Sequence, residues 1–126
     1  MKINEAGWDL VHPVAVSDQT FERDVLQSKV PVLVDLWAPW CGPCRMMSPV
    51  LDAAAEKMGG ALKFTKFNTD ENPRMARQFQ IMAIPSLLVF EKGQEKDRAV
   101  GFVPQPELEN WLRSFAPAAP ASEAQG

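Results

Sequence analysis

The only two cysteines of this 126-residue chain, Cys41 and Cys44, are three residues apart and can form a reversible disulfide. A turn that leads into a helix brings side chains at positions i and i+3 together, within the Cβ separation of about 3.5–4.5 Å that a disulfide needs. A bridge that closes so short a loop removes little entropy from the unfolded chain, so it stabilises a fold poorly. The pair therefore predicts thiol–disulfide exchange.

A zinc site is the alternative use of two cysteines at this spacing. Structural zinc sites are built from four ligands, most often cysteine and histidine. Apart from Cys41 and Cys44 the chain has no cysteine, and His12 is its only histidine. The number of ligands therefore favours exchange chemistry, and we expect no bound metal.

Motifs that lie far apart in the sequence extend this prediction. They are residues 32–44, which end in Trp-Cys-Gly-Pro-Cys, the pair Ile84-Pro85, and residues 86–93. Together they resemble the thioredoxin family over roughly residues 14–115, which is more specific than a lone Cys-x-x-Cys. The resemblance implies an α/β protein with the thioredoxin fold, a central mixed β-sheet flanked by α-helices.

The two cysteines are expected to have different roles. Cys41 should face solvent where backbone N–H groups and the helix dipole stabilise a thiolate and lower its pKa, so we expect it to attack. Cys44, one turn further in, should resolve the mixed disulfide. Between them, Gly42 permits close approach of a backbone and Pro43 pre-sets a helical φ. These two residues are either an ordinary turn and helix start or, in addition, tune the redox couple.

Asp35 is the least expected residue of the apolar run before the cysteines. A carboxylate among apolar neighbours is costly to ionise, so burial should raise its pKa. The alternative is a side chain that reaches solvent or a backbone donor at the strand end. The resemblance to thioredoxins implies that Asp35 accepts the proton of Cys44 as a general base and that Lys66 lies beside it. Without the resemblance, Lys66 is one more charged strand residue.

Four residues are expected to contact client polypeptides. Only about 5–6% of X–Pro bonds are cis, so Ile84-Pro85 taken alone favours trans. The resemblance reverses this expectation and implies a cis-proline loop beside the cysteines, where the backbone of Ile84 pairs with an extended client. Trp40 flanks the reactive loop, where an aromatic residue most often serves packing. The resemblance adds a docking surface that includes Trp40 and Gly101.

Alternating strands and helices must position these residues. In residues 30–37, apolar side chains occur at both odd and even positions, so both faces of a strand here would be apolar. This predicts a central strand that is covered on both faces and places the cysteines at its carboxyl end. The other strands are expected at 13–17, 62–68, 86–91 and 98–102, and the helices at 19–27, 43–58, 73–79 and 105–115.

Local signals predict details of these elements. Side chains that can cap helix N-termini precede two of the helices: Ser17 and Asp18 the first, and Asp70, Glu71 and Asn72 the third. Pro49 lies inside the long helix and predicts a kink. Met46 and Met47 are expected to serve helix packing rather than a cofactor site.

Length and composition favour one domain with a substantial core, because 46% of the 126 residues are hydrophobic. We expect an N-terminal extension at 1–12, a thioredoxin domain at 13–115 and a disordered tail at 116–126. The formal net charge is -3 and the basic residues are dispersed, so neither nucleic acid nor a membrane is an expected partner. Residues 1–9 lack an apolar signal core, so we expect a cytoplasmic protein. We also expect it to be a monomer.

The expected function is that of a general protein-disulfide reductase without a bound cofactor. The resemblance implies two kinds of partner: disulfide-containing client proteins, and thioredoxin reductase or an equivalent electron donor that restores the dithiol. A disulfide oxidant or isomerase with the same thiols is one alternative. A non-catalytic interaction subunit that uses the same surface without turnover is another.

Overall fold

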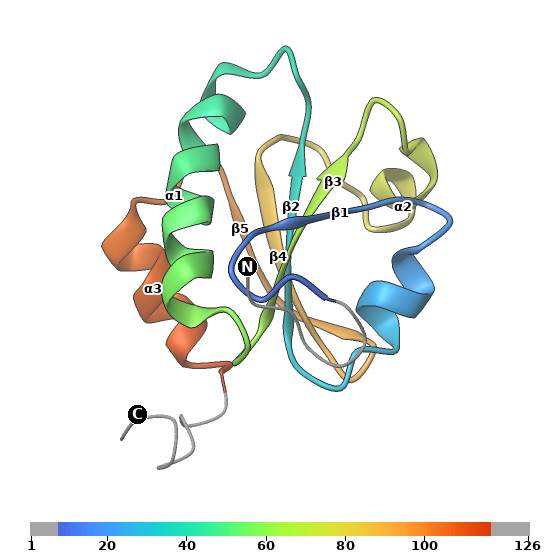
Figure 1. Cartoon of the computed structure of the whole chain (residues 1–126). Coiled ribbons are helices and arrows are strands. Elements are labelled where there is room, and N and C mark those ends of the chain that lie inside the picture. The colour runs from blue at the N-terminus through green and yellow to red at the C-terminus, as the bar shows by residue number, and fades with distance from the viewer. Residues whose placement is uncertain (1–7, 117–126) are drawn as a thin grey trace, which may run out of the picture.

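Five strands form one mixed sheet in the order β1-β3-β2-β4-β5 (Figure 1). The structure is a computed structural model that describes residues 8–116. Along the chain, its elements are β1 (Val14–Val16), the short π-helix η1 (Glu22–Leu26), β2 (Val32–Trp37), α1 (Gly42–Met58), β3 (Lys63–Asn68), α2 (Pro73–Gln78), β4 (Ser86–Glu91), β5 (Gln94–Val100) and α3 (Gln105–Arg113).

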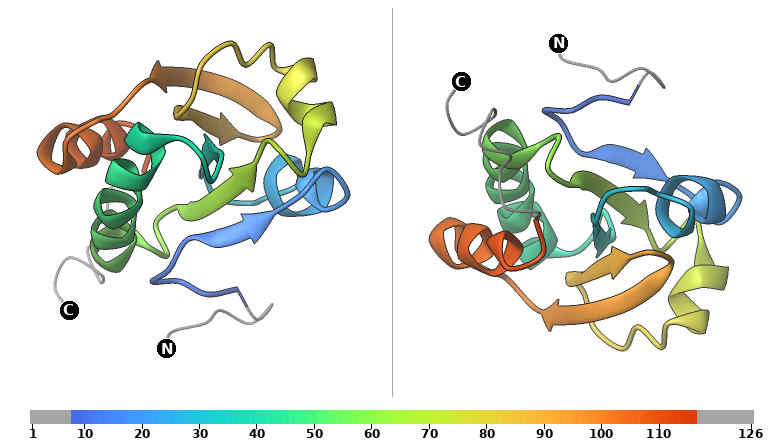
Figure 2. Two further views of the ribbon diagram at one scale, coloured as in Figure 1. Left: turned by 90° about the horizontal axis from the view of Figure 1, so that it is seen from above. Right: turned by 90° about the horizontal axis from the view of Figure 1, so that it is seen from below.

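The sheet lies between two layers of helix. Helices α1 and α3 cover one face, and η1 and α2 cover the other (Figure 2). Strand β2 lies at the centre, where it pairs in parallel with β3 and antiparallel with β4. Its first five residues, from Val32 to Leu36, are each at most 2% exposed, because both of their faces are covered. The predicted mixed sheet flanked by helices is therefore confirmed.

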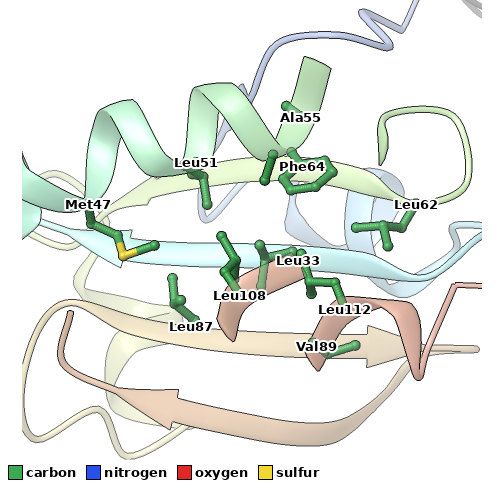
Figure 3. Packing of buried hydrophobic residues seen from close by; sticks show 11 residues of the cluster. Leu33, Met47, Leu51, Ala55, Leu62, Phe64, Leu87, Val89, Leu108 and Leu112 are labelled. Atoms are coloured by element: carbon green, nitrogen blue, oxygen red, sulfur yellow. The ribbon is translucent and has the colours of Figure 1, made fainter. Parts of the chain in front are cut away.

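Two apolar clusters, one on each face, hold the layers together. On the α1 and α3 face, Leu108 and Leu112 of α3 point toward Leu33 of β2, and Met47 and Leu51 approach from α1 (Figure 3). The cluster on the other face is rich in aromatic residues. It includes Phe21, Val25, Phe67, Met75 and Phe90.

The parallel pairing of β2 and β3 brings two connections to the same end of the sheet. The loop that follows β2 leads directly into α1, and the loop that follows β3 leads into α2 (Figure 1). Since ligand sites in parallel sheets form beyond the carboxyl ends of the strands, a site is expected at this end of the sheet. Both cysteines lie there.

Helix α1 runs without interruption through Pro49. Pro43 occupies its first turn, where a missing N–H leaves no hydrogen bond unmade. Met46 and Met47 were both expected to serve helix packing, and this expectation is wrong for Met46. Met47 is fully buried under the sheet, whereas Met46, one position earlier, is 59% exposed because it points away from the apolar face of the helix.

The first helix differs from its prediction. A turn at residues 18–20, in which Thr20 N–H donates to Ser17 Oγ at 3.2 Å, precedes the five-residue η1. Asp18 caps a different helix from the one predicted. Its carboxylate accepts hydrogen bonds from the backbone N–H groups of Arg74 at 3.1 Å and Met75 at 2.9 Å, in the first turn of α2. A residue 56 and 57 positions away in the sequence thus satisfies donors for which nearer residues were expected.

The second strand of the hairpin near the C-terminus begins and ends earlier than predicted, whereas its first strand, β4, lies at the predicted residues. Lys92 and Gly93 have φ values of 53° and 81°, so they form a tight two-residue turn of the kind that matches strand twist. Gln94 therefore already pairs with Glu91 in the sheet. Strand β5 ends at Val100, which places Phe102 outside the strand that was predicted to contain it.

Part of the predicted N-terminal extension belongs to the packed structure. The ring of Trp8 packs against the aromatic cluster, and Lys63 Nζ lies 4.0 Å from the ring centroid. Residues 1–7 and nearly all of the predicted disordered tail, 117–126, lie outside the described residues. Among the helices of residues 8–116, none has the length and apolar character to cross a bilayer.

Candidate active site

Cys41 and Cys44 form a disulfide at the N-terminus of α1, with their Cα atoms 5.2 Å apart. Cys41 is the N-cap residue, and its Sγ accepts a hydrogen bond from the backbone N–H of Cys44 at 3.2 Å. The first N–H groups of a helix have no intrahelical acceptor and carry the positive end of the helix dipole. The sulfur of Cys41 thus lies where negative charge is stabilised, as the sequence predicts.

The expectation that Cys41 faces solvent is wrong for the disulfide form. Cys41 is 4% exposed and Cys44 is 3% exposed, so burial does not distinguish them. Cys41 is covered because its Sγ lies 3.7 Å from the carbonyl oxygen of Ile84, in the loop that precedes β4.

Gly42 and Pro43 form the first turn of α1 between the two cysteines. A Cβ atom built on Gly42 would have no neighbour within 4 Å, and the φ of Gly42 is not positive, so the fold itself does not require glycine here. The open space lies beside the disulfide. This leaves room for the close approach of another backbone, which a larger side chain at position 42 would hinder.

Asp35 lies in β2, six residues before Cys41, and is 1% exposed. One of its carboxylate oxygens has no hydrogen-bond partner among the described residues. Burial raises the pKa of Asp35 to about 7, against a smaller opposing effect of the positive charge on Lys66. The predicted rise is confirmed, and the alternative of a side chain that reaches solvent is wrong. The carboxyl is poised to exchange a proton near neutral pH.

Lys66 lies opposite Asp35 in the parallel pairing of β2 and β3. The two side chains form no direct ion pair. Instead, Lys66 Nζ lies 3.4 Å from Ser48 Oγ on α1 and 4.9 Å from the centroid of the Trp37 ring. Sequence reasoning missed Ser48, although its position four residues after Cys44 placed it on the same face of the helix.

The bond between Ile84 and Pro85 is cis, as the resemblance predicted. Pro85 is buried, and its carbonyl oxygen accepts a hydrogen bond from the backbone N–H of Gly101 at 2.7 Å. Gly101 has a φ of 96°, in the left-handed region that favours glycine. The structure thus brings Ile84, Pro85 and Gly101 together, and Ile84 reaches Cys41.

Trp40 is 67% exposed beside the disulfide, as expected of a residue on a docking surface. Its Nε1–H donates to both carboxylate oxygens of Asp70, at 3.1 and 3.0 Å, which holds the indole against the loop between β3 and α2. The sequence had suggested Asp70 only as a helix cap. Nothing in the spacing of residues 40 and 70 indicated that they would meet.

The zinc alternative has too few ligands. Within residues 8–116, no group of three or more histidine, cysteine, aspartate or glutamate side chains could hold a metal ion together. His12, the only histidine, is exposed, and its Nδ1 pairs with Asp9 at 3.0 Å.

The disulfide includes the N-cap residue of α1 and lies beside a cis-proline loop, and the sheet has the strand order β1-β3-β2-β4-β5. Together these features define a thiol–disulfide oxidoreductase with the thioredoxin fold. The thioredoxin family model matches residues 12–114. The chain is 53% identical to Thioredoxin 1 of Synechococcus elongatus over 98 residues, which make up 78% of this chain and 92% of the relative. It is 54% identical to Thioredoxin 1 of a Nostoc species over 97 residues, 77% of this chain and 91% of the relative.

A chloroplast protein is also similar. Thioredoxin M4, chloroplastic, of Arabidopsis thaliana is 45% identical over 100 residues, 79% of this chain and 52% of the relative. The chain belongs to the thioredoxin family, and it acts by dithiol–disulfide exchange through Cys41 and Cys44.

Proposed function

We propose that the protein is a general protein-disulfide reductase in which Cys41 attacks and Cys44 resolves. The observation that carries the assignment is the position of the two sulfurs. Cys41 Sγ accepts a hydrogen bond from the N-terminus of α1, which stabilises it as a thiolate once the disulfide is reduced, and it lies against the loop that can hold a client. Cys44 lies one turn inside the helix.

The reaction is two successive exchanges between sulfurs. The Cys41 thiolate attacks one sulfur of the client disulfide, that bond breaks, and the other client sulfur leaves as a thiolate that takes up a proton. Cys44 then loses its proton and attacks Cys41 Sγ, which releases the second client thiol. The client gains two electrons and two protons, and the Cys41–Cys44 disulfide is formed again.

Asp35 is the proposed acceptor of the Cys44 proton, directly or through a water molecule. Its buried carboxyl with a pKa of about 7 can take a proton and lose it again at neutral pH. Lys66 is proposed to limit the rise of that pKa, because its positive charge favours the ionised carboxylate.

The remaining proposed roles concern the client and the redox couple. Trp40, Ile84, Pro85 and Gly101 are proposed to contact the client, with backbone groups of Ile84 pairing with an extended segment next to its disulfide. Gly42 and Pro43 are proposed to tune the potential through the geometry of the first turn. A change of about 30 mV corresponds to about 1.4 kcal/mol for a two-electron couple, so small differences in this turn matter.

The proposed cycle needs an electron donor but no bound cofactor. We propose that a thioredoxin reductase or an equivalent donor reduces the Cys41–Cys44 disulfide, and that the protein works as a monomer in the cytoplasm, where thiols are kept reduced. The same thiols could serve a disulfide oxidant or isomerase. Titration against glutathione separates these functions, since a reductase couple should be more reducing than the range of about -120 to -180 mV found for oxidants and isomerases.

The test of the assignment uses Cys44→Ser. The variant keeps the attacking sulfur but lacks the group that completes the cycle, because a serine hydroxyl stays protonated at neutral pH and does not displace a sulfur. We expect client proteins to remain covalently bound, one per molecule, and to be released by dithiothreitol. Non-reducing gels and mass spectrometry measure these adducts.

Cys41→Ser is the matched control, which should form no adducts, and neither variant should show multiple turnover. A different result would point to the interaction subunit. If Cys41→Ser captured the same clients with undiminished affinity, and the unsubstituted protein showed no turnover with any recycling reductant, the reductase assignment would be withdrawn.

A further inference from the structure

A groove leads away from the disulfide, between α2 and the loop that precedes β4. It consists of two adjoining hollows that share Thr69, Ala76, Ile81 and Met82 as lining residues. Three of these four side chains are apolar, and Met82 is 94% exposed. A flexible methionine that projects into solvent from such a groove is typical of surfaces that bind polypeptides of varied sequence.

The near end of the groove is continuous with the candidate active site. Trp40 and Ile84 line this end. Trp40 precedes Cys41 in the chain, and the carbonyl oxygen of Ile84 lies 3.7 Å from Cys41 Sγ. A polypeptide whose cysteine meets Cys41 can therefore continue into the groove.

The far end of the groove carries one positive charge, the guanidinium of Arg77. No other charged residue lines either hollow. Within residues 8–116, the Arg77 side chain takes part in no hydrogen bond or ion pair. Each of the other five arginines does, with these partners: Arg23 with Asp24, Arg45 with Pro39, Arg74 with Asp18, Arg98 with Glu95 and Arg113 with Glu109.

A charge of the opposite sign lies beside the near end of the groove, next to one of its lining residues. The carboxylate of Asp70 is fixed beside the indole of Trp40 by two hydrogen bonds. A client segment that leaves the disulfide therefore passes near the negative charge of Asp70, which lies beside Trp40 but does not line the groove, then crosses apolar side chains and reaches the unpaired Arg77. An acidic residue next to the client cysteine is disfavoured by Asp70, whereas one further along can reach Arg77.

We propose that Arg77 makes this groove select client segments in which apolar residues after the reacting cysteine are followed by an acidic one. The inference rests on the proposed function, because the occupant enters through Cys41. An arginine can hold a carboxylate with two parallel hydrogen bonds, which gives the contact direction as well as charge. A single cation in a chain of net charge -3 fits one client carboxylate better than a polyanion.

The test compares disulfide-linked peptides that differ at one position. Each peptide carries two apolar residues after its cysteine and then glutamate, glutamine or lysine, placed at successive distances. In wild-type protein the glutamate peptide should have the highest kcat/KM at its best distance. Arg77→Glu should lower kcat/KM for that peptide by about two- to fivefold, the range expected for one exposed ion pair, and should raise it for the lysine peptide.

Two controls separate this effect from others. Lys96→Glu makes the same change in net charge on β5, outside the groove, and should alter all three peptides alike. High salt should abolish the difference between Arg77→Glu and wild type, because exposed charges are screened. Met82→Gln keeps the length of the side chain but not its apolar character, so it should lower kcat/KM for all peptides together.

Reduction of hydroxyethyl disulfide, which is too small to enter the groove, distinguishes failure of this inference from failure of the proposed function. It should proceed equally in wild type and Arg77→Glu. If the small disulfide is reduced but Arg77→Glu and Arg77→Gln treat the three peptides as wild type does, the inference is overturned. If wild type reduces no disulfide at all, the proposed function fails first, and the inference fails with it.

Discussion

At the scale of single residues, Asp35 links the stability of the protein to its chemistry. Its carboxyl is buried in the central strand, and burial raises its pKa to about 7. A proton acceptor for Cys44 must be ionised to act, yet an ionised carboxylate is what the apolar interior disfavours. The same side chain therefore favours activity and disfavours folding as the pH rises.

We predict that the wild-type protein loses stability as the pH rises from about 4 to 7, and that Asp35→Asn abolishes this loss. Between about pH 4 and 7 the folded protein holds a proton on Asp35 that the unfolded chain has released, so raising the pH shifts the equilibrium toward the unfolded state. Since one pKa unit corresponds to about 1.4 kcal/mol, this loss is on the order of 4 kcal/mol when complete. Urea unfolding of the disulfide form at several pH values measures the difference between variant and wild type.

The variant also tests the proposed role of Asp35. Release of the mixed disulfide should slow in Asp35→Asn, while the first attack by Cys41 keeps its rate. Asp52→Asn, which changes an exposed carboxyl on α1, should alter neither step nor the pH profile. A slowed first attack with unchanged release would show that Asp35 is not the acceptor of the Cys44 proton.

What the sequence predicted at this scale was the chemistry available at each position. The spacing of Cys41 and Cys44 implied the disulfide, and a carboxylate within an apolar run implied a raised pKa. The contacts between loops at the end of the sheet that carries the disulfide could not be predicted, because they depend on where loops from different elements meet. Trp40 and Asp70, 30 residues apart, are the clearest example.

At the scale of elements, α2 depends on a residue that lies far from it in the chain. This helix has only six residues, too few to be stable alone, and its own N-cap Asn72 makes no capping hydrogen bond with its side chain. Asp18 supplies the acceptor for two of its first N–H groups. The turn after β1 thereby fixes α2, the helix that forms one side of the groove between α2 and the loop that precedes β4.

We predict that Asp18→Ala lowers the free energy of unfolding by about 1–2 kcal/mol, the usual cost of losing an N-cap. Asp18→Asn should cost less, since its side-chain oxygen can still accept one hydrogen bond. The backbone N–H groups of Arg74 and Met75 should exchange with solvent faster in the alanine variant. Unchanged exchange and unchanged stability would show that Asp18 is not the cap.

The order of elements could be predicted from the sequence more reliably than their ends. Strand β4 is observed at the predicted residues, because its apolar run is bounded by Pro85 and by the turn at Lys92 and Gly93. The first helix lacks such boundaries. Its predicted cap Asp18 is used elsewhere, and only the π-helical turns of η1 remain.

At the scale of the whole molecule, the sheet separates two cores that share no side chains. Leu108 of α3 belongs to one cluster and Val25 of η1 to the other, and each is at most 1% exposed. Strand β2 contributes alternate residues to both. The two layers therefore meet only through the backbone of the sheet, although one cooperative transition is expected for a domain of this size.

This separation predicts how core substitutions combine. Leu108→Ala should lower the free energy of unfolding by about 2–5 kcal/mol, and Val25→Ala by about 1–3 kcal/mol, through lost burial and the cavity left behind. Because the sites lie on opposite faces and share no contacts, the double variant should lose the sum of the two within about 0.5 kcal/mol.

Leu108→Ala combined with Leu112→Ala is the matched pair within one cluster. These residues are one turn apart on α3 and line the same space, so the second truncation enlarges an existing cavity and the two losses should not add. Urea unfolding of the single and double variants, followed by tryptophan fluorescence, measures both pairs. A deviation from additivity for Leu108 with Val25 as large as that for Leu108 with Leu112 would mean that the sheet transmits strain between its faces, and that the two layers form one core.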